Sequence, residues 1–568
     1  MYTGNKLIEL LAKQQKNRRG QTELLRTGTF TIQWRTKVGS YPHPDGETII
    51  SAGEPCGHWK YDNTQKLNVG NNYQQFYTLP LYGYIPGSSI RGLVRAWAKK
   101  YPDKSQRMNE LLGYQDNEKI VPGKIEFFDA YPQEASLLTL DIVNPQQEFQ
   151  VFHKGQSTPL SFYTLGDGED KISLTIGIRG IPNKATAQEV QEVWEWVEQA
   201  LSLYGVGSRT ASGYGAIKSN NQPKLKRPVD QSVKIFTFTL YSQGCYGANQ
   251  SNSDVELRPS HWRGWLRSWV WRFLLGVMSQ DNAKKTLGEL LGNIDDNNGT
   301  SQQGCVRLEL IKSSTFGDSS DDYPRFYTWK GKVKITAPKD ILNKIILPII
   351  KFAVSVGGLG RGWRRPLHIF QMNNGHNAAR GCYLKLSHKA KSKTTGDFKT
   401  ISYQLSPDKP ETWSETYQKW LEAVQIKWSD RLTINANQNL EAEVFSPTTC
   451  SIYAVPGPDL NPIDESEQDW QNIRRNEETR GDGMNLIYKD KYKRKTDVGG
   501  NAGHGNAHCS WVSIRMSNTP HPTIDTDTQE IVCLFMGRQS SNSNHLRPQF
   551  LKDLSSILGS TFLFGLPT

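Results

Sequence analysis

The chain has 568 residues, a formal net charge of +12 and a pI of about 9.1. This length allows about three to five domain-sized units. Seven scattered cysteines without a Cys-x-x-Cys pair argue against a disulfide framework and predict a cytoplasmic protein. A basic excess is typical of proteins that bind a polyanion, although many soluble proteins are mildly basic without doing so. The longest apolar run, residues 341–356, is broken by lysine and proline, so we expect no membrane partner.

In chain order, alternating β-branched and aromatic residues first predict a strand within residues 22–40. A loop rich in Gly, Pro, Asn and His follows over 41–80, and a helix is predicted over about 88–101. After two short strands, the amphipathic segment 186–205 predicts a second helix, which ends at a glycine.

Residues 221–233 are polar and basic and contain proline, which predicts a linker. The same order of elements then restarts, with a strand over 234–242 and helices over 259–276 and 340–358. Farther on, a helix is predicted over 412–428, and the polar segment 457–509 is interpreted as loop or local disorder. Two strands and a helix close the chain.

Two short motifs occur twice in the same order. Residues 91–97 and 263–269 share the pattern Arg-Gly-x-(Val/Leu)-Arg-(Ala/Ser)-Trp, and glycine- and arginine-rich loops follow at 204–215 and 356–367. Two motifs that recur at similar spacing indicate a duplicated domain. We therefore predict a first unit over 1–220 and a second over 234–370, with 371–568 as its C-terminal half and an insertion at about 457–509.

The first motif begins with "PGSSIRG" and predicts an anion site. Ser88 or Ser89 would cap the helix, whose free N–H groups attract negative charge. Arg91 and Arg95 lie four residues apart on one helix face and suit phosphate contacts. The alternative is an ordinary capped helix with solvated arginines.

The second copy of the motif interleaves arginines with tryptophans. Trp262, Trp265 and Trp269 have the spacing of a helix face that points into a core. The neighbouring arginines are predicted to bind phosphate: Arg258, Arg263 and Arg267.

The two glycine-rich loops supply further candidate RNA-binding residues. Glycines let the backbone approach a ligand closely, and hydroxyl and guanidinium groups beside them can donate to phosphates. These candidates are Gly207, Ser208, Arg209 and Thr210 in the first loop, and Arg361, Arg364 and Arg365 in the second. Neither loop has the pattern of a mononucleotide-binding loop.

The pair "IPGSSIRGLVR" and "GVGSRTASGYG" resembles the RAMP superfamily of CRISPR-associated proteins. The first half looks most like the sixth-subunit type of Cmr complexes. The second half, with "ELRPSHWRGWLRSWVWR" and "VGGLGRGWRRPL", is similar to the first-subunit type. A fusion of two such units also resembles type III-D effectors. By motif, the resemblance covers about residues 25–370.

The resemblance implies an α+β chain of two tandem ferredoxin-like (RRM-like) units, the second enlarged by insertions. It also implies a structural subunit that grips guide RNA toward its 3′ end. Base pairing between guide and target would then read sequence, while the protein reads backbone and shape. Expected partners are guide RNA, target RNA and other subunits of a type III effector complex.

Two alternatives are enzymes. Backbone subunits of the family carry a catalytic aspartate in the loop before the PGSS turn, where this chain has Asp62. Asp62 would then cleave guide-paired target RNA, with Mg²⁺ if cleavage occurs; otherwise no firmly bound cofactor is expected. A guide-processing RAMP endonuclease would instead need His58 or His43 as general base.

One further cluster has the composition of a metal site. His504, His508 and Cys509 lie within six residues, and Cys450 would be a fourth ligand for zinc. The alternative is a flexible glycine loop, and no metal site is assigned.

Overall fold

The computed structural model of the chain describes most of the sequence. The described residues are 4–17, 21–37, 67–69, 72–74, 83–116, 119–134, 136, 138–143, 147–153, 160–166, 171–242, 245–246, 255–294, 301–315, 327–391, 397–463, 470, 472–501, 508–537 and 546–568. They form two compact units. Unit 1 comprises Met1–Val143, Pro159–Gln231 and Gly247–Ser251, and unit 2 comprises Asn144–Thr158, Ser232–Tyr246 and Asn252–Thr568. The boundaries predicted from sequence remain predictions.

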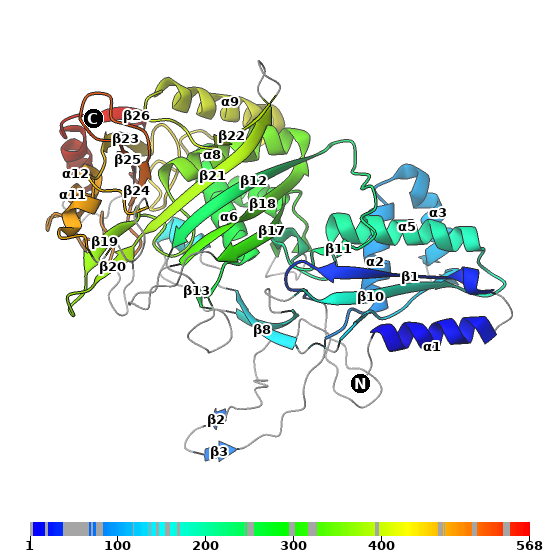
Figure 1. Cartoon of the computed structure of the whole chain (residues 1–568). Coiled ribbons are helices and arrows are strands. Elements are labelled where there is room, and N and C mark those ends of the chain that lie inside the picture. Colours follow the sequence, from blue (N-terminus) through cyan, green and yellow to red (C-terminus); the bar gives the residue numbers. More distant parts are fainter. Residues whose placement is uncertain are drawn as a thin grey trace. The chain divides into compact units, whose positions relative to one another are not determined.

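Unit 1 is built on an antiparallel sheet of order β11-β1-β10-β6, with β7 also paired to β10 (Figure 1). Its elements are α1 (Gly4–Asn17), η1 (Gln21–Leu24), β1 (Leu25–Ile32), β2 (Leu67–Val69), β3 (Asn72–Gln74), α2 (Gly87–Ala98), α3 (Pro102–Leu112), β4 (Gly113–Asp116), β5 (Lys119–Pro122), β6 (Ile125–Phe127), β7 (Tyr131–Pro132), β8 (Leu138–Val143), β9 (Leu160–Leu165), β10 (Ser173–Gly180), α5 (Ala187–Tyr204), η2 (Thr210–Ser212) and β11 (Ile217–Ser219).

The predicted helix at 186–205 is confirmed as α5, and its ends follow from sequence. Thr186 and Glu189 form a capping box, and Gly205, with φ +67°, ends the helix. α5 and α2 pack together and bury their apolar residues in the core of unit 1, among them Val94, Trp97 and Val197. α1 packs against β10, where a Cβ on Gly4 would lie 2.5 Å from the carbonyl oxygen of Tyr131.

Unit 2 contains a second antiparallel sheet, of order β17-β18-β12-β21-β22. Up to residue 431, the elements of unit 2 are α4 (Gln147–Phe152), β12 (Gln231–Ser242), β13 (Cys245–Tyr246), β14 (Val255–Glu256), α6 (Pro259–Leu275), α7 (Gln280–Leu291), β15 (Asn293–Ile294), β16 (Ser301–Gln302), β17 (Arg307–Thr315), β18 (Tyr327–Pro338), η3 (Ile341–Ile346), α8 (Leu347–Val356), β19 (His368–Gln371), β20 (Asn377–Arg380), β21 (Cys382–Lys391), β22 (Phe398–Ser402), α9 (Glu411–Lys427) and η4 (Ser429–Arg431). The pairs β13-β14, β15-β16 and β19-β20 form small sheets of their own.

The predicted helix at 340–358 begins as a π-helix, η3, and continues as α8. The π-helix ends at Ile346, and Pro348, which has no N–H to donate, lies in the first turn of α8. α8 is buried almost all round because it packs against α6, α9 and strands of two sheets. Trp262, Trp265 and Trp269 of α6 lie in the same core, as predicted.

The C-terminal segment forms a sheet of its own, of order β24-β25-β23-β26, which we call the C-terminal sheet. Its elements are β23 (Cys450–Pro456), η5 (Asn476–Thr479), α11 (Asp482–Tyr488), β24 (Val512–Ser517), β25 (Gln529–Phe535), α12 (Leu546–Ser555) and β26 (Thr561–Gly565). The interpretation of 457–509 as loop or disorder is therefore wrong in part. α11 lies within it, and Met484, Leu486 and Ile487 of α11 are buried.

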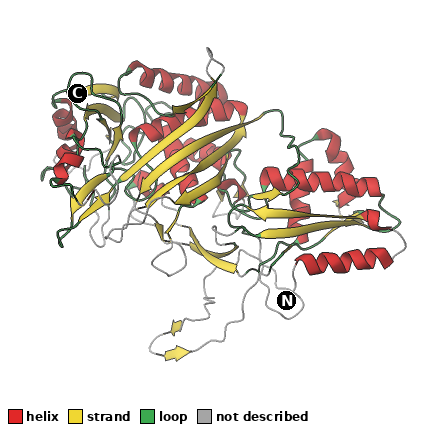
Figure 2. Cartoon of the chain, in the orientation of Figure 1, coloured by secondary structure: helices red, strands yellow, loops and turns green. Residues whose placement is uncertain are grey.

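All three sheets have the same connectivity, strand-helix-strand-strand-helix-strand. Figure 2 shows the helices and strands of the described residues by type. If their strands are numbered one to four along the chain, strand 1 lies between strands 3 and 4, and strand 2 pairs with strand 3. Strands 1 to 4 are β1, β6, β10 and β11 in unit 1. In the second sheet they are β12, β17, β18 and β21, and in the C-terminal sheet they are β23, β24, β25 and β26. The predicted α+β class is confirmed, and the third copy was not foreseen. Along the described segments, no helix is long and apolar enough to span a membrane.

Candidate nucleic-acid interface

The arginines of the repeated motif make the same contacts in both units. In unit 1, Arg91 of α2 donates to the carbonyl oxygen of Leu112, and Arg95 donates to that of Gly113. In unit 2, Arg263 of α6 donates to Leu291 and Arg267 donates to Gly292 at 2.8 Å. Each arginine pair therefore caps the C-terminus of the next helix in the chain: Arg91 and Arg95 cap α3, and Arg263 and Arg267 cap α7.

The reason is the chemistry of a helix end. The last carbonyls of a helix lack intrahelical partners and carry partial negative charge, which cations satisfy. Gly113 and Gly292 end α3 and α7 with φ of +76° and +75°. Burial, with the neighbouring charge of Arg267, lowers the pKa of Arg263 to about 10. These arginines thus have backbone partners within the protein, and their contact with phosphate remains a prediction.

Removal of one of these caps should cost stability. We expect Arg263→Ala to lower the free energy of unfolding of unit 2 by about 1–3 kcal/mol, because the carbonyls of Leu291 and Val306 lose a donor. Urea denaturation followed by tryptophan fluorescence would measure the change. Lys284→Ala, on the exposed face of α7, is the control; an equal midpoint for the two variants would contradict a capping role.

The N-terminus of α2 differs from the prediction. Its N-cap is Pro86, no side chain caps it, and Ser88 and Ser89 lie in its first turn. The N–H of Gly87 donates to Oδ1 of Asp129 at 2.8 Å, so one helix-end donor already has an anionic partner. In the second copy, Arg258 is buried just ahead of Pro259, the first residue of α6.

The first glycine loop, residues 205–215, is hydrogen-bonded to the segment that follows β1 in unit 1. The N–H of Ser208 donates to the carbonyl oxygen of Lys37 at 2.6 Å, and that of Gly215 donates to Arg35 at 2.8 Å. Tyr214 donates to the buried carboxylate of Asp141 at 2.5 Å. These bonds hold the base of the loop.

The tip of the first glycine loop is exposed and basic. Gly207, Ser208 and Arg209 are exposed, and Arg209 has φ +58°, which is uncommon for a residue with a side chain. Burial lowers the pKa of Lys37, and the positive charge of Arg209 lowers it further. The second effect indicates that these two cations lie close together. Lys37 belongs to no motif, so sequence reasoning missed it. Thr210, the fourth predicted residue of the loop, is half-buried.

The second glycine loop, residues 357–365, lies against the corresponding strand of unit 2. The carbonyl oxygen of Arg361 accepts a bond of 3.1 Å from the hydroxyl of Ser242, the last residue of β12. Gly360 and Gly362, on either side of Arg361, have φ of +83° and +78°. Arg361 is exposed. Arg209 and Arg361 thus occupy comparable places at the tips of two loops.

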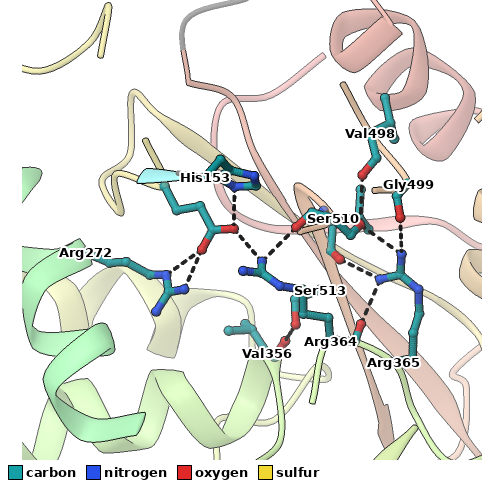
Figure 3. A network of polar contacts seen from close by, with 11 residues as sticks. His153, Arg272, Val356, Arg364, Arg365, Val498, Gly499, Ser510 and Ser513 are labelled. Carbon is teal, nitrogen blue, oxygen red and sulfur yellow. Dashed lines mark hydrogen bonds and ion pairs between the residues drawn. The ribbon is translucent and has the colours of Figure 1, made fainter. Parts of the chain in front are cut away.

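Arg364 and Arg365 belong to a buried network instead (Figure 3). Arg364 donates to Glu443 and to the carbonyl oxygen of Ser510, and Arg365 donates to that of Val512 at 2.6 Å. Glu443 also accepts from Arg272 of α6, with Nε at 2.8 Å, and contacts His153 at 3.0 Å. The last two loop arginines therefore fasten the loop to the C-terminal sheet.

The arginines of this network keep the carboxyl group of Glu443 in its charged form. Arg364 and Arg272 outweigh the effect of burial and hold the pKa of Glu443 far below its usual range. Burial lowers the pKa of His153, whose ring stacks on Trp511 with centroids 3.9 Å apart. Nothing in the sequence pattern singled out Glu443 or His153, which lie 290 residues apart.

The residues of the two enzyme alternatives lie outside the described residues. These are Asp62, His58 and His43, and His504 of the proposed zinc cluster lies outside them as well. Among the residues that the structure does describe, no three His, Cys, Asp or Glu side chains are grouped as metal ligands. Cys450 is buried and bonds to the carbonyl oxygen of Ser446. Cleavage and metal binding stay predictions.

Comparison with known proteins identifies the first unit. The sequence model of the RAMP superfamily matches residues 36–218. This segment is therefore similar to the RAMP superfamily, and the match supports the resemblance predicted from the motifs. None of the curated proteins matches the chain in sequence.

Three solved structures are similar to parts of the chain. A chain from the cryo-EM structure of type III-B Cmr-beta bound to cognate target RNA is 15% identical over 39% of this chain and 66% of its own length, with a TM-score of 0.25. Cmr6 from Pyrococcus furiosus is 19% identical over 34% and 97%, with a TM-score of 0.19. A chain of a type IV-B CRISPR complex is 13% identical over 36% and 95%, with a TM-score of 0.21. These scores are too low to define the fold of the whole chain.

Proposed function

We propose that the chain is a guide-RNA-binding structural subunit of a cytoplasmic type III CRISPR effector complex. In this proposal each glycine loop contacts the backbone of the guide toward its 3′ end, and the partners are guide RNA, target RNA and other subunits. The observation that carries the proposal is the recurrence of an exposed arginine, Arg209 or Arg361, at the tip of a glycine loop that is hydrogen-bonded to the chain at the end of strand 1 or just after it.

The loop geometry supports contact with phosphates. A loop whose glycines adopt positive φ presents backbone N–H groups without side chains in the way. Arginine adds a donor fork that matches phosphate oxygens. Lys37 adds a second cation beside Arg209, and the net charge of +12 agrees with a polyanionic partner.

The fold supports the same proposal. We propose that each of the three sheets is the core of a ferredoxin-like unit, because the βαββαβ connectivity recurs in each. Two of the units have glycine loops between the second helix and strand 4. In the C-terminal sheet, residues 556–560 make that connection and contain one glycine, Gly559. Guide contact by glycine loops is therefore assigned to the first two.

Target-RNA cleavage by Asp62 is kept as a second proposal, on the family pattern alone. It predicts that Asp62→Ala abolishes one cut in guide-paired target RNA, whereas a purely structural subunit would lose nothing.

The salt dependence of RNA binding tests the main proposal. We expect the full-length chain to bind single-stranded RNA and log K to fall steeply with log[salt], since each neutralised phosphate contributes about −0.7 to the slope. The double variant Arg209→Gln/Arg361→Gln should weaken binding and make the slope shallower by about 1.4.

A matched variant controls for net charge. Arg227→Gln/Arg494→Gln also removes one exposed arginine from each unit, and it should leave affinity and slope nearly unchanged. Equal effects of the two double variants would contradict a special role for the loop tips. Absence of RNA binding by the unsubstituted chain would overturn the proposal.

A further inference from the structure

The three related sheets differ in what covers the face opposite their connecting helices. In unit 1, α1 lies on the sheet beside β10, with Gly4 and Ile8 close to Thr175 and Gly177. In the C-terminal sheet, every residue of β23, β24 and β25 is buried, so both faces are covered. The sheet of β17, β18, β12, β21 and β22 is different, because one of its faces carries exposed side chains.

The burial pattern separates the two faces of this sheet. Phe236, Phe238 and Leu240 of β12 point into the core, whereas Ile235 and Thr237 between them are exposed. On β18, Val333 and Ile335 are buried and the alternate residues are lysines. We call the exposed side the outer face (Figure 1).

The outer face is rich in lysine. Its described side chains include Lys330, Lys332 and Lys334 on β18, Thr237 and Thr239 on β12, Lys385 and Lys389 on β21, and Thr400 and Ser402 on β22. Among the described residues of these strands, Glu309 is the one acid on this face, and Arg307 (2.6 Å) and Lys334 already neutralise it. The face therefore has a net positive charge and many hydroxyl donors.

We propose that the outer face is a second binding surface for single-stranded RNA, which contacts the phosphate backbone without reading sequence. The proposal deepens the proposed function and rests on it. Lysines at alternate positions of a strand are about 6.8 Å apart, and neighbouring strands are about 4.8 Å apart. The face therefore offers rows of point charges along and across the strands, and such rows track a flexible polyanion.

A polyanion suits this face better than an apolar partner does. Its lysines are flexible, strongly hydrated charges. Of the aromatic residues of the face, Tyr241 and Tyr383 stand at one end, where they pack partly against a small cluster that includes Leu367 and Trp470, and Phe398 of β22 is exposed at the other end. The lysine-rich part of the face, on β18 and β21, remains accessible to the RNA.

The test is a charge-matched pair of triple variants in the full-length chain. Lys332→Gln/Lys385→Gln/Lys389→Gln removes three exposed charges from the outer face. Lys284→Gln/Lys285→Gln/Lys419→Gln removes three from the exposed sides of α7 and α9. Affinity for a single-stranded RNA of mixed sequence would be measured over a salt series, and unchanged thermal midpoints would show that both variants fold.

We expect the outer-face variant to make the salt slope shallower by about 2, at about 0.7 per lost contact, and the helix variant to leave it nearly unchanged. If the loop variant Arg209→Gln/Arg361→Gln weakens binding and the outer-face variant does not, the outer-face proposal is wrong and the proposed function stands. If the outer-face variant keeps its RNA affinity but no longer binds an acidic protein partner, the face binds protein and the proposal is wrong. If the unsubstituted chain binds no RNA, both proposals fall.

Discussion

Glu443→Gln is expected to lower the free energy of unfolding of unit 2 by about 3–5 kcal/mol, the cost typical of a buried ion pair that loses one partner. Glu443 is fully buried and is shared by Arg272, Arg364 and His153. A glutamine of the same size keeps the packing and one acceptor, but it leaves two buried guanidinium groups without a counter-charge. Chemical denaturation followed by tryptophan fluorescence would measure the loss.

A surface ion pair provides the matched control. Glu415 and Lys419 lie 3.5 Å apart on α9, with 60% and 74% of their side chains exposed. Glu415→Gln should therefore change the free energy of unfolding by no more than about 0.5 kcal/mol. If Glu443→Gln is as mild as Glu415→Gln, the buried network does not fasten the second glycine loop to the C-terminal sheet.

The network should also persist in acid. The pKa of Glu443 in the folded protein lies well below its value of about 4.3 in an unfolded chain. Its contribution to stability is therefore fully present above that unfolded value, decreases as the pH falls below it, and is gone once the pH has fallen through the folded pKa.

Gly215→Ala is the substitution expected to damage the first glycine loop most. Gly215 has φ +62°, and a Cβ there would lie 1.8 Å from the carbonyl oxygen of Val206. That carbonyl belongs to backbone which cannot move aside, because Val206 donates to Gly215 at 2.9 Å and Gly215 donates to Arg35. We expect a loss of about 3 kcal/mol and, because the tip with Arg209 is displaced, RNA binding at least tenfold weaker.

Gly92→Ala is the control within the same unit. Gly92 lies inside α2, where nothing stands within 4 Å of a new Cβ. Alanine should therefore raise the stability of unit 1 by about 0.5–1 kcal/mol and leave RNA affinity unchanged. Thermal unfolding and fluorescence anisotropy would measure both quantities, and equal behaviour of the two alanine variants would show that the loop does not depend on its glycine.

The sequence predicted local features well where one residue type decides the local structure. Thr186, Glu189 and Gly205 fix the ends of α5 through a capping box and a positive φ, so this helix could be placed closely. The four-residue spacing of Arg91 and Arg95 correctly predicted a shared helix face. The carbonyls that this face contacts could not be predicted, because the fold brings the end of α3 to α2 from outside the motif.

The two closing strands and the closing helix, β24, β25 and α12, were predicted, but that they form a separate sheet was not. Every residue of β23, β24 and β25 is buried, but burial on both faces does not show which other strands a strand pairs with, so the local sequence could not reveal a separate sheet. The first helix of the C-terminal sheet, α11, has 7 residues within a charged segment. The partners in the buried network were missed because single residues such as His153 and Glu443 have no spacing signal when the chain between them is long.

The most direct test of the central claim is to map where RNA lies on the chain. Single-stranded RNA bound to the full-length protein would be crosslinked by ultraviolet light, and the crosslinked peptides would be identified by mass spectrometry. We predict crosslinks within 205–215 and 357–365, lost selectively in Arg209→Gln/Arg361→Gln. Crosslinks confined to other segments, and unchanged in that variant, would contradict the claim that the two glycine loops bind RNA.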